Sequence, residues 1–264
     1  MTTDSRVALV TGASQGIGRV VSTHLRAAGY EVAAIARSQP LLAELAAETG
    51  AMPVVLDVTD AQAVAGAVAH VEAELGPISL LVNNAGISGN GGASWEHEPA
   101  DWWRVFEVNV LGSFLLCHAV VPRMVERRSG RVVNLSSNAA FFAIDDDFEP
   151  ILSSAYLASK AAVIRFSEAL AGEARPAGVG VFAISPGMVK TDMTAGPFAD
   201  DWDDPELWSP PELAADLVEF IGSGAFDELA GRYIHAAADD WRHLMERTPE
   251  IIENDLYAMR VRKL

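Results

Sequence analysis

The chain contains little that would point to a secreted, nucleic-acid-binding or metal-binding protein. It has one cysteine, Cys117, in 264 residues, so no disulfide can form within the chain and a reducing compartment is compatible with its composition. Its 19 Lys and Arg side chains are outnumbered by 36 Asp and Glu, and the net charge of −17 argues against nucleic acid or an anionic membrane as a partner. The six histidines lack the spacing of metal ligands, so no metal site is expected.

Long apolar runs and targeting signals are also missing. The longest strongly apolar uncharged stretch, Val108 to Pro122, is interrupted by Asn109, Ser113 and His118 and is too short and too polar to span a bilayer. The N-terminal residues lack the basic-then-apolar pattern of a signal peptide. We therefore expect a soluble cytoplasmic protein with no membrane partner.

Short β-branched apolar runs alternate with Ala-rich helical stretches along the chain. Most runs are continuously apolar, as expected of parallel strands covered on both faces. Strands are predicted at Val7–Val10, Val32–Ile35, Met52–Leu56, Leu80–Val82, Val132–Leu135, Val179–Ile184 and Arg232–His235. Helices are predicted at Val20–Ala28, Leu41–Thr49, Ala61–Leu75, Ala100–Val125, Tyr156–Ala174 and Pro211–Ile221. The pattern predicts an α/β fold, a doubly wound parallel sheet of about seven strands with helices on both faces, in a single domain over residues 1–264.

Three segments depart from this alternation. Residues 139–153, with the triplet Asp145–Asp147, and residues 194–210 are predicted to be loops that face the substrate. The aromatic residues Phe198, Trp202 and Trp208 in the second loop indicate a fairly apolar substrate, or else they pack the closed loop. Residues 239–264 read as a charged helix followed by a tail.

A Tyr and a Lys four residues apart open one of the predicted helices. At this spacing Tyr156 and Lys160 lie on the same helix face, one turn apart. An ammonium beside a phenol favours the phenolate, so the pair predicts a lowered Tyr pKa and proton exchange with an alcohol or carbonyl oxygen. Taken alone, the pair also fits an ordinary solvated helix face.

A glycine-rich turn follows the first predicted strand and precedes a helix. Glycines at this position permit a tight turn and a close approach of the backbone to a pyrophosphate, while the helix N-terminus supplies N–H groups. The second strand ends at Arg37, where a carboxylate would hold an adenosine ribose; a guanidinium instead suits a 2′-phosphate. The ends of the third and fourth strands complete the predicted site, and Asp57 at the end of the third would accept a hydrogen bond from the adenine amino group. The predicted nucleotide-binding residues are Gly12, Ser14, Gln15, Gly16, Ile17, Gly18, Arg37, Ser38, Asp57, Val58, Asn84, Ala85 and Gly86.

These motifs together resemble the short-chain dehydrogenase/reductase family in its single-domain form, with a Rossmann-type fold. The resemblance covers roughly residues 5–237. The matching segments, in the family's order, are Thr11-Gly12 with Gly16-Ile17-Gly18, Asn83-Asn84-Ala85-Gly86, Val108-Asn109-Val110, Asn134-Leu135-Ser136-Ser137, Tyr156 with Lys160, and Pro186-Gly187 followed by Thr191-Asp192-Met193.

The resemblance implies a catalytic tetrad of Asn109, Ser137, Tyr156 and Lys160. Ser137 would hydrogen-bond the substrate oxygen, Tyr156 would be the general acid or base, Lys160 would bind the nicotinamide ribose and lower the Tyr156 pKa, and Asn109 would hold a water of the proton relay. Ser136 is the competing serine. The resemblance also implies that the nicotinamide side is formed by Tyr156, Lys160, Pro186, Gly187, Val189 and Thr191.

The expected function is an NADP(H)-dependent oxidoreductase, a ketoreductase or alcohol dehydrogenase acting on a carbonyl or secondary alcohol of a small molecule. NAD(H) is possible, and the alternatives are an NAD-linked alcohol dehydrogenase or a catalytically silent nucleotide-binding sensor or scaffold.

Nineteen positions separate Ser137 from Tyr156, more than is usual in the family. The apolar helices 100–125 and 156–174 predict a homotetramer or homodimer. The tail would add a second contact or fold back on its own subunit, with Tyr257, Met259 and Val261 as apolar anchors.

Overall fold

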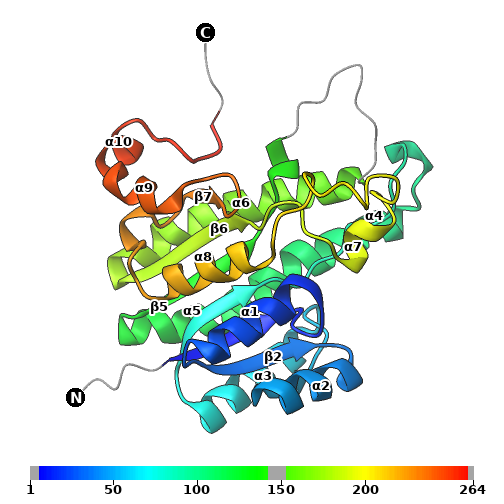
Figure 1. The fold of residues 1–264 in the computed structure, drawn as a ribbon. Helices are drawn as coiled ribbons and strands as arrows, with labels where there is room; N and C mark the ends of the chain where they lie inside the picture. The colour runs from blue at the N-terminus through cyan, green and yellow to red at the C-terminus, as the bar shows by residue number, and fades with distance from the viewer. Residues whose placement is uncertain (1–5, 142–152, 261–264) are drawn as a thin grey trace.

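One sheet of seven parallel strands runs through residues 6–141 and 153–260, which are the residues described by this computed structural model (Figure 1). The order across the sheet is β3-β2-β1-β4-β5-β6-β7. The strands are β1 (Val7–Thr11), β2 (Glu31–Ala36), β3 (Met52–Val55), β4 (Ile78–Asn83), β5 (Gly130–Leu135), β6 (Val179–Ser185) and β7 (Tyr233–His235). The predicted doubly wound, Rossmann-type sheet is confirmed. Its strand order reverses between β1 and β4, and ligands bind at such a switch point in open α/β sheets.

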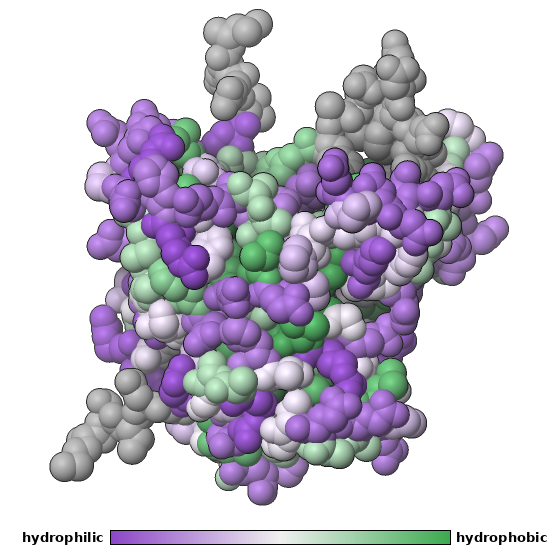
Figure 2. Space-filling view, in the orientation of Figure 1, coloured by the Kyte–Doolittle hydropathy of each residue, from purple (hydrophilic) through white to green (hydrophobic). Residues whose placement is uncertain are grey.

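Helices cover both faces of the sheet (Figure 1). They are α1 (Gly16–Ala27), α2 (Gln39–Thr49), α3 (Ala61–Leu75), α4 (Pro99–Phe106), α5 (Gly112–Arg127), α6 (Ser154–Ala174), α7 (Asp192–Ala195), α8 (Glu212–Gly222), α9 (Trp241–Glu246) and α10 (Thr248–Glu253). On the face seen in Figure 2, polar residues predominate at the periphery and apolar residues gather toward the middle.

Each face of the sheet has its own hydrophobic core. In β1, Ala8 and Val10 belong to the core under α1, α2 and α8, whereas Val7 and Leu9 belong to the core under α3, α5 and α6. Burial on both faces explains why the central strands are continuously apolar. The edge strand β3 departs from that expectation, since its residues alternate in exposure and Val55 is 56 % exposed.

The predicted helix Ala100–Val125 is not a regular α-helix throughout. A π-helical turn, η2 (Glu107–Leu111), joins α4 to α5 and carries Asn109 into the interior. Such turns are frequent at functional sites. The whole run Pro99–Arg127 is longer than the apolar stretch considered above, and it is long and apolar enough to cross a bilayer by length and composition only. Its α5 part packs into the core of the sheet through residues such as Leu116 and Val120, which accounts for its apolar character.

The C-terminal segment folds back on its own chain. It forms two short helices, α9 and α10, rather than the single charged helix expected from the sequence. Trp241, Leu244 and Ile251 are buried in the core on the α8 side. The backbone N–H of Tyr233, at the free edge of β7, donates to the carbonyl of Tyr257 at 2.9 Å. Of the expected anchors, Tyr257 packs on this core, and Val261 lies outside the described residues.

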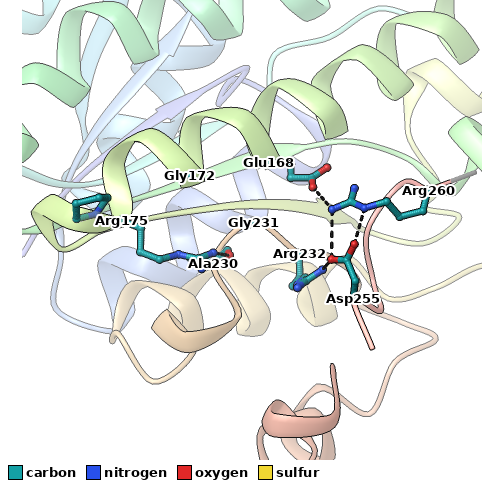
Figure 3. A pocket seen from close by; sticks show the side chains of 9 residues that line it. Glu168, Gly172, Arg175, Ala230, Gly231, Arg232, Asp255 and Arg260 are labelled. Carbon is teal, nitrogen blue, oxygen red and sulfur yellow. Dashed lines mark hydrogen bonds and ion pairs between the residues drawn. The ribbon is translucent and has the colours of Figure 1, made fainter. Parts of the chain in front are cut away.

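Ion pairs attach the end of this segment to α6 and β7 (Figure 3). The Asp255 carboxylate accepts from Arg232 at 2.6 Å and from Arg260 at 2.5 Å, and Arg260 also pairs with Glu168 of α6. We call these four residues the tail clasp. Together with Arg175 they line a cavity of about 280 Å³.

The two predicted substrate loops are described to different extents. The first begins with a 3₁₀ turn, η3 (Asn138–Phe141), and the Asp145–Asp147 triplet lies outside the described residues. The second begins with α7 and contains an aromatic cluster. There the ring centres of Trp202 and Trp208 lie 5.0 Å apart, and the Lys190 Nζ lies 5.0 Å from the centre of the Trp202 ring and 5.4 Å from that of the Trp208 ring. The aromatic side chains of this loop therefore pack on one another and on Lys190.

Candidate active site

The start of α6 places a Tyr and a Lys beside the end of β5. The Ser153 hydroxyl caps this helix by accepting from the Tyr156 N–H at 3.2 Å, which fixes the first turn. The Lys160 ammonium lies 5.6 Å from the centre of the Tyr156 ring and donates to the Leu135 carbonyl at 2.8 Å. Lys160 is 5 % exposed. The predicted Tyr–Lys pair is therefore buried between the helix and the sheet.

Burial governs the protonation of both groups. It raises the pKa of Tyr156, and a hydrogen bond with Ser137 offsets part of the rise. Burial lowers the pKa of Lys160 to about 8. The expected lowering of the Tyr156 pKa is thus wrong for this structure, because desolvation of the phenolate is the largest cause and only the Ser137 hydrogen bond opposes it. The phenol is protonated at neutral pH.

The two serines after β5 have different partners. Ser136 is buried, and its hydroxyl donates to the Lys160 carbonyl at 2.9 Å. Ser137 is half-buried and its side chain hydrogen-bonds Tyr156, while its hydroxyl oxygen also accepts from the Ala139 N–H at 3.1 Å. Of the two, Ser137 is therefore the one that shares a site with the phenol.

Asn109 faces this site from the π-helical turn. Its side-chain amide exchanges hydrogen bonds with the backbone of Ile87, at 2.9 and 3.0 Å, and donates to the Ser159 hydroxyl at 2.9 Å. A side chain at Gly86 would lie 3.2 Å from the Asn109 Oδ1 and 3.6 Å from the Lys160 Nζ, so this glycine adjoins both. In this arrangement Asn109 holds the segment after β4 against α6.

The glycine-rich turn closes tightly against the end of β4. Gly12 has φ +65°, and a Cβ there would lie 2.7 Å from the Asn84 Nδ2, which itself donates to the Thr11 carbonyl at 2.9 Å. A Cβ at Gly18 would lie 2.3 Å from the Gly12 carbonyl oxygen. Glycine is thus required at both positions. The N-terminus of α1 opens at this turn, and its N–H groups fit a pyrophosphate.

The end of β2 and the end of β3 meet at the expected adenosine side. Arg37 is exposed and has no ion-pair partner in the described part of the chain. The Asp57 carboxylate accepts from the Thr59 hydroxyl at 2.7 Å and pairs with Arg104 at 3.2 Å. Its pKa is lowered by hydrogen bonds from Thr59 and by the charges of Arg104 and Arg37, against the effect of burial. Both predicted residues therefore lie at one site, which carries two guanidinium groups.

The segment after β6 forms the wall of the candidate site that faces the glycine-rich turn. Gly187 has φ +92°, and a Cβ there would lie 2.6 Å from the Ser209 hydroxyl. Thr191 caps α7 and lies against the glycine-rich turn at Gly16. The Gln15 amide donates to Asp192 at 2.9 Å, joining the two walls. The remaining predicted residues of this wall, Pro186 and Val189, belong to the same segment, and Val189 is buried.

Two hydroxyl residues support the site: Thr11 is part of the glycine-rich motif but had no role assigned from the sequence, and sequence reasoning missed Ser159. The Thr11 hydroxyl oxygen accepts hydrogen bonds from the backbone N–H groups of Asn84 and Ala85, both at 3.0 Å. The Ser159 hydroxyl oxygen accepts a hydrogen bond from the Asn109 side-chain amide. Serine and threonine are common everywhere, and their spacing from the motifs carries no periodic signal. The hydrogen-bonding capacity of Thr11 at the end of a buried strand is the one feature that would have singled it out.

Cys117 has no place in this chemistry. It is fully buried in α5, and burial raises the pKa of its thiol to about 12. Among the described residues, no group of three or more His, Cys, Asp or Glu side chains is arranged to bind a metal ion.

A doubly wound parallel sheet with a glycine-rich turn at its switch point defines a dinucleotide-binding protein. The family model of short chain dehydrogenases matches residues 6–202. The chain belongs to this family of oxidoreductases, which use nicotinamide cofactors.

Curated relatives and solved structures agree with this assignment. A short chain dehydrogenase of Pseudocercospora fijiensis is 44 % identical over 196 aligned positions, and the match covers 72 % of this chain and 62 % of that protein. An acetoacetyl-CoA reductase of Paracoccus denitrificans is 37 % identical and covers 83 % of this chain and 91 % of its own length. A 3-oxoacyl-(acyl-carrier protein) reductase of Brucella melitensis, solved with bound NAD, has a TM-score of 0.77 and 30 % identity, over 89 % of this chain and 90 % of that chain.

Proposed function

We propose that the protein reduces a carbonyl group of a small molecule to an alcohol with NADPH, and catalyses the reverse oxidation with NADP. The observation that carries this proposal is the buried pair of Tyr156 and Lys160, whose ammonium lies 5.6 Å from the centre of the phenol ring, with Ser137 acting on the same phenol. Two hydroxyl donors that meet beside a buried cation match the needs of a carbonyl oxygen that gains a proton.

The bound nicotinamide would supply the hydride, and the protein's own groups supply the proton. Ser137 donates a hydrogen bond to the substrate oxygen, and Tyr156 passes its proton to the same oxygen. The raised pKa of Tyr156 keeps the phenol protonated at neutral pH, which favours the general-acid role and the direction of reduction. Lys160, with its pKa lowered to about 8, stabilises the phenolate that remains and returns a proton to it. The water expected at Asn109 stays a prediction.

The cofactor preference rests on Arg37. Its guanidinium is exposed and unpaired in the described part of the chain, at the end of β2 where a ribose-binding carboxylate is missing. This favours a 2′-phosphate and hence NADP(H). The alternative, NAD(H), is favoured by the Brucella melitensis structure, which holds NAD.

Initial rates with NADPH and NADH, measured on a panel of ketones, quinones and aldehydes, test both points. We expect turnover with NADPH and a lower KM for NADPH than for NADH. Arg37→Gln should weaken that preference, and Arg37→Asp should reverse it by repelling the phosphate. Equal KM values in the wild type would refute the NADPH preference. Cofactor binding without turnover on any substrate would favour a silent nucleotide sensor.

We also propose that two copies associate through the outer faces of α5 and α6, as a homodimer or as half of a homotetramer. Leu111 and Phe114 precede and begin α5 with 41 % and 46 % of their surface exposed, and Val125 near its end is 39 % exposed. An exposed apolar helix face of this kind fits a two-fold contact. Sedimentation should detect a species heavier than the 28.1 kDa chain, and Phe114→Glu should dissociate it. A wild-type monomer would refute this proposal.

We place the assembled protein in the cytoplasm.

A further inference from the structure

Tyr233, the first residue of β7, carries a hydroxyl group that the reaction described above does not use. This oxygen is buried, and no hydrogen-bond partner of normal geometry lies within reach in the described structure. A buried polar group without a partner is destabilising, and native structures rarely contain one. Burial raises the pKa of this phenol to about 12, and the charge of Tyr156 contributes to the rise. The unused phenol therefore lies near the proposed catalytic one and remains a neutral donor.

The ring of Tyr233 contacts the last residue of η3. The ring centres of Tyr233 and Phe141 lie 5.0 Å apart with an angle of 68° between their planes, which is an edge-to-face contact. Phe141 is also the last described residue in the first part of the first substrate loop. One end of the turn that follows Ser137 is therefore packed against β7.

The hydroxyl of Tyr233 reaches the first residue of η3 through Ser185. Tyr233 pairs with Ala183 of β6, and Ser185 is two residues further on, so all three side chains share one face of the sheet. The Ser185 hydroxyl opposes the rise in the pKa of this phenol and is thus the nearest candidate partner for it, although the two oxygens do not form a hydrogen bond of normal geometry. Ser185 is buried, and its hydroxyl oxygen accepts from the Asn138 N–H at 3.3 Å. Tyr233 thus touches both ends of η3, one directly and one through a serine.

We propose that Tyr233 is a positioning residue for Ser137, acting through η3. A small rotation directs its O–H at the Ser185 oxygen, which leaves a second lone pair of that oxygen for the Asn138 N–H. Phe141 holds the other end of the turn. This fixes the direction in which Ser137 presents its hydroxyl to the substrate oxygen. The inference rests on the proposed function, because Ser137 has this task only if the protein reduces a carbonyl group.

The test removes the hydroxyl and keeps the ring. In Tyr233→Phe we expect kcat to fall about tenfold, the scale of a slightly misplaced catalytic group, while the KM for NADPH stays within about twofold. The melting temperature should change little, because one hydrogen bond is lost while the ring keeps its contact with Phe141. Ser185→Ala should lower kcat similarly, and the double variant should be no worse than Ser185→Ala alone. Tyr257→Phe, a hydroxyl deletion in the tail, is the control and should keep wild-type kcat.

Hydrogen exchange gives a second readout that needs no substrate. We expect the peptide containing residues 138–141 to exchange about tenfold faster in Tyr233→Phe than in the wild type, and not in Tyr257→Phe. Wild-type kcat and unchanged exchange in Tyr233→Phe would overturn the inference. Faster exchange with wild-type kcat would overturn it too, by reducing Tyr233 to a structural contact. A wild type without turnover on any substrate would refute the proposed function, whatever the exchange result.

Discussion

The two ends of α6 use charged groups in opposite ways. At the N-terminal end, one ammonium, that of Lys160, is buried among hydroxyl and amide groups with a backbone carbonyl as its hydrogen-bond partner. Near the other end, the tail clasp has four charges in direct pairs at the surface, with 15–46 % of each side chain exposed. Burial makes electrostatic interactions strong and shifts pKa values, whereas exposed pairs contribute little each. The first end is arranged for proton transfer and the second for attaching a segment.

Replacing each of the neighbouring serines Ser136 and Ser137 by alanine should give the largest contrast in activity. Ser137→Ala removes a donor to the developing oxyanion, so we expect kcat to fall about 10²-fold or more. Ser136→Ala, the matched control, removes a hydrogen bond to the Lys160 carbonyl. It should cost about 1 kcal/mol of unfolding free energy with a much smaller effect on kcat. Equal losses of kcat would break the distinction between the two serines.

The buried Lys160 should leave a pH signature on stability. Its pKa is lowered from 10.5 to about 8 in the folded chain. Between those values the unfolded chain holds the proton and the folded chain does not, so this group makes stability rise with pH. Relative to Lys160→Met, the wild-type free energy of unfolding should rise by about 2 kcal/mol between about pH 8 and 9.5. Denaturant titrations in which the difference stays flat would contradict the burial account.

The tail clasp should give the smallest effect, and one that salt removes. Arg260→Gln breaks the pairs with Asp255 and Glu168 and should lower the free energy of unfolding by at most about 1 kcal/mol, with kcat unchanged. The difference should shrink in about 1 M salt because exposed charges are screened. Arg247→Gln, which breaks an exposed pair within the tail, is the control and should have a smaller effect. A loss of kcat in Arg260→Gln would connect the tail to the active site.

Periodicity and motif order were enough to predict the seven strands, their parallel arrangement and the segments that meet at the switch point. Local patterns did not predict the π-helical turn at Asn109, whose side chain bonds Ile87 and Ser159, both distant in sequence. The fold of the tail was likewise not predictable, because the backbone carbonyl of Tyr257 accepts a hydrogen bond at the edge of β7 and a backbone contact leaves no pattern in the side chains. The raised Tyr156 pKa was missed because spacing indicates proximity to Lys160 but not the depth of burial.

The most direct test of the account is kcat of Tyr156→Phe with NADPH, measured beside cofactor binding and melting temperature. The substitution removes one hydroxyl and keeps the ring in the cluster with Val105, Ala139 and Ala155. We predict a fall in kcat of about 10²–10⁴-fold, with NADPH binding and melting temperature nearly unchanged. A variant that folds, binds NADPH and retains wild-type kcat would contradict the account.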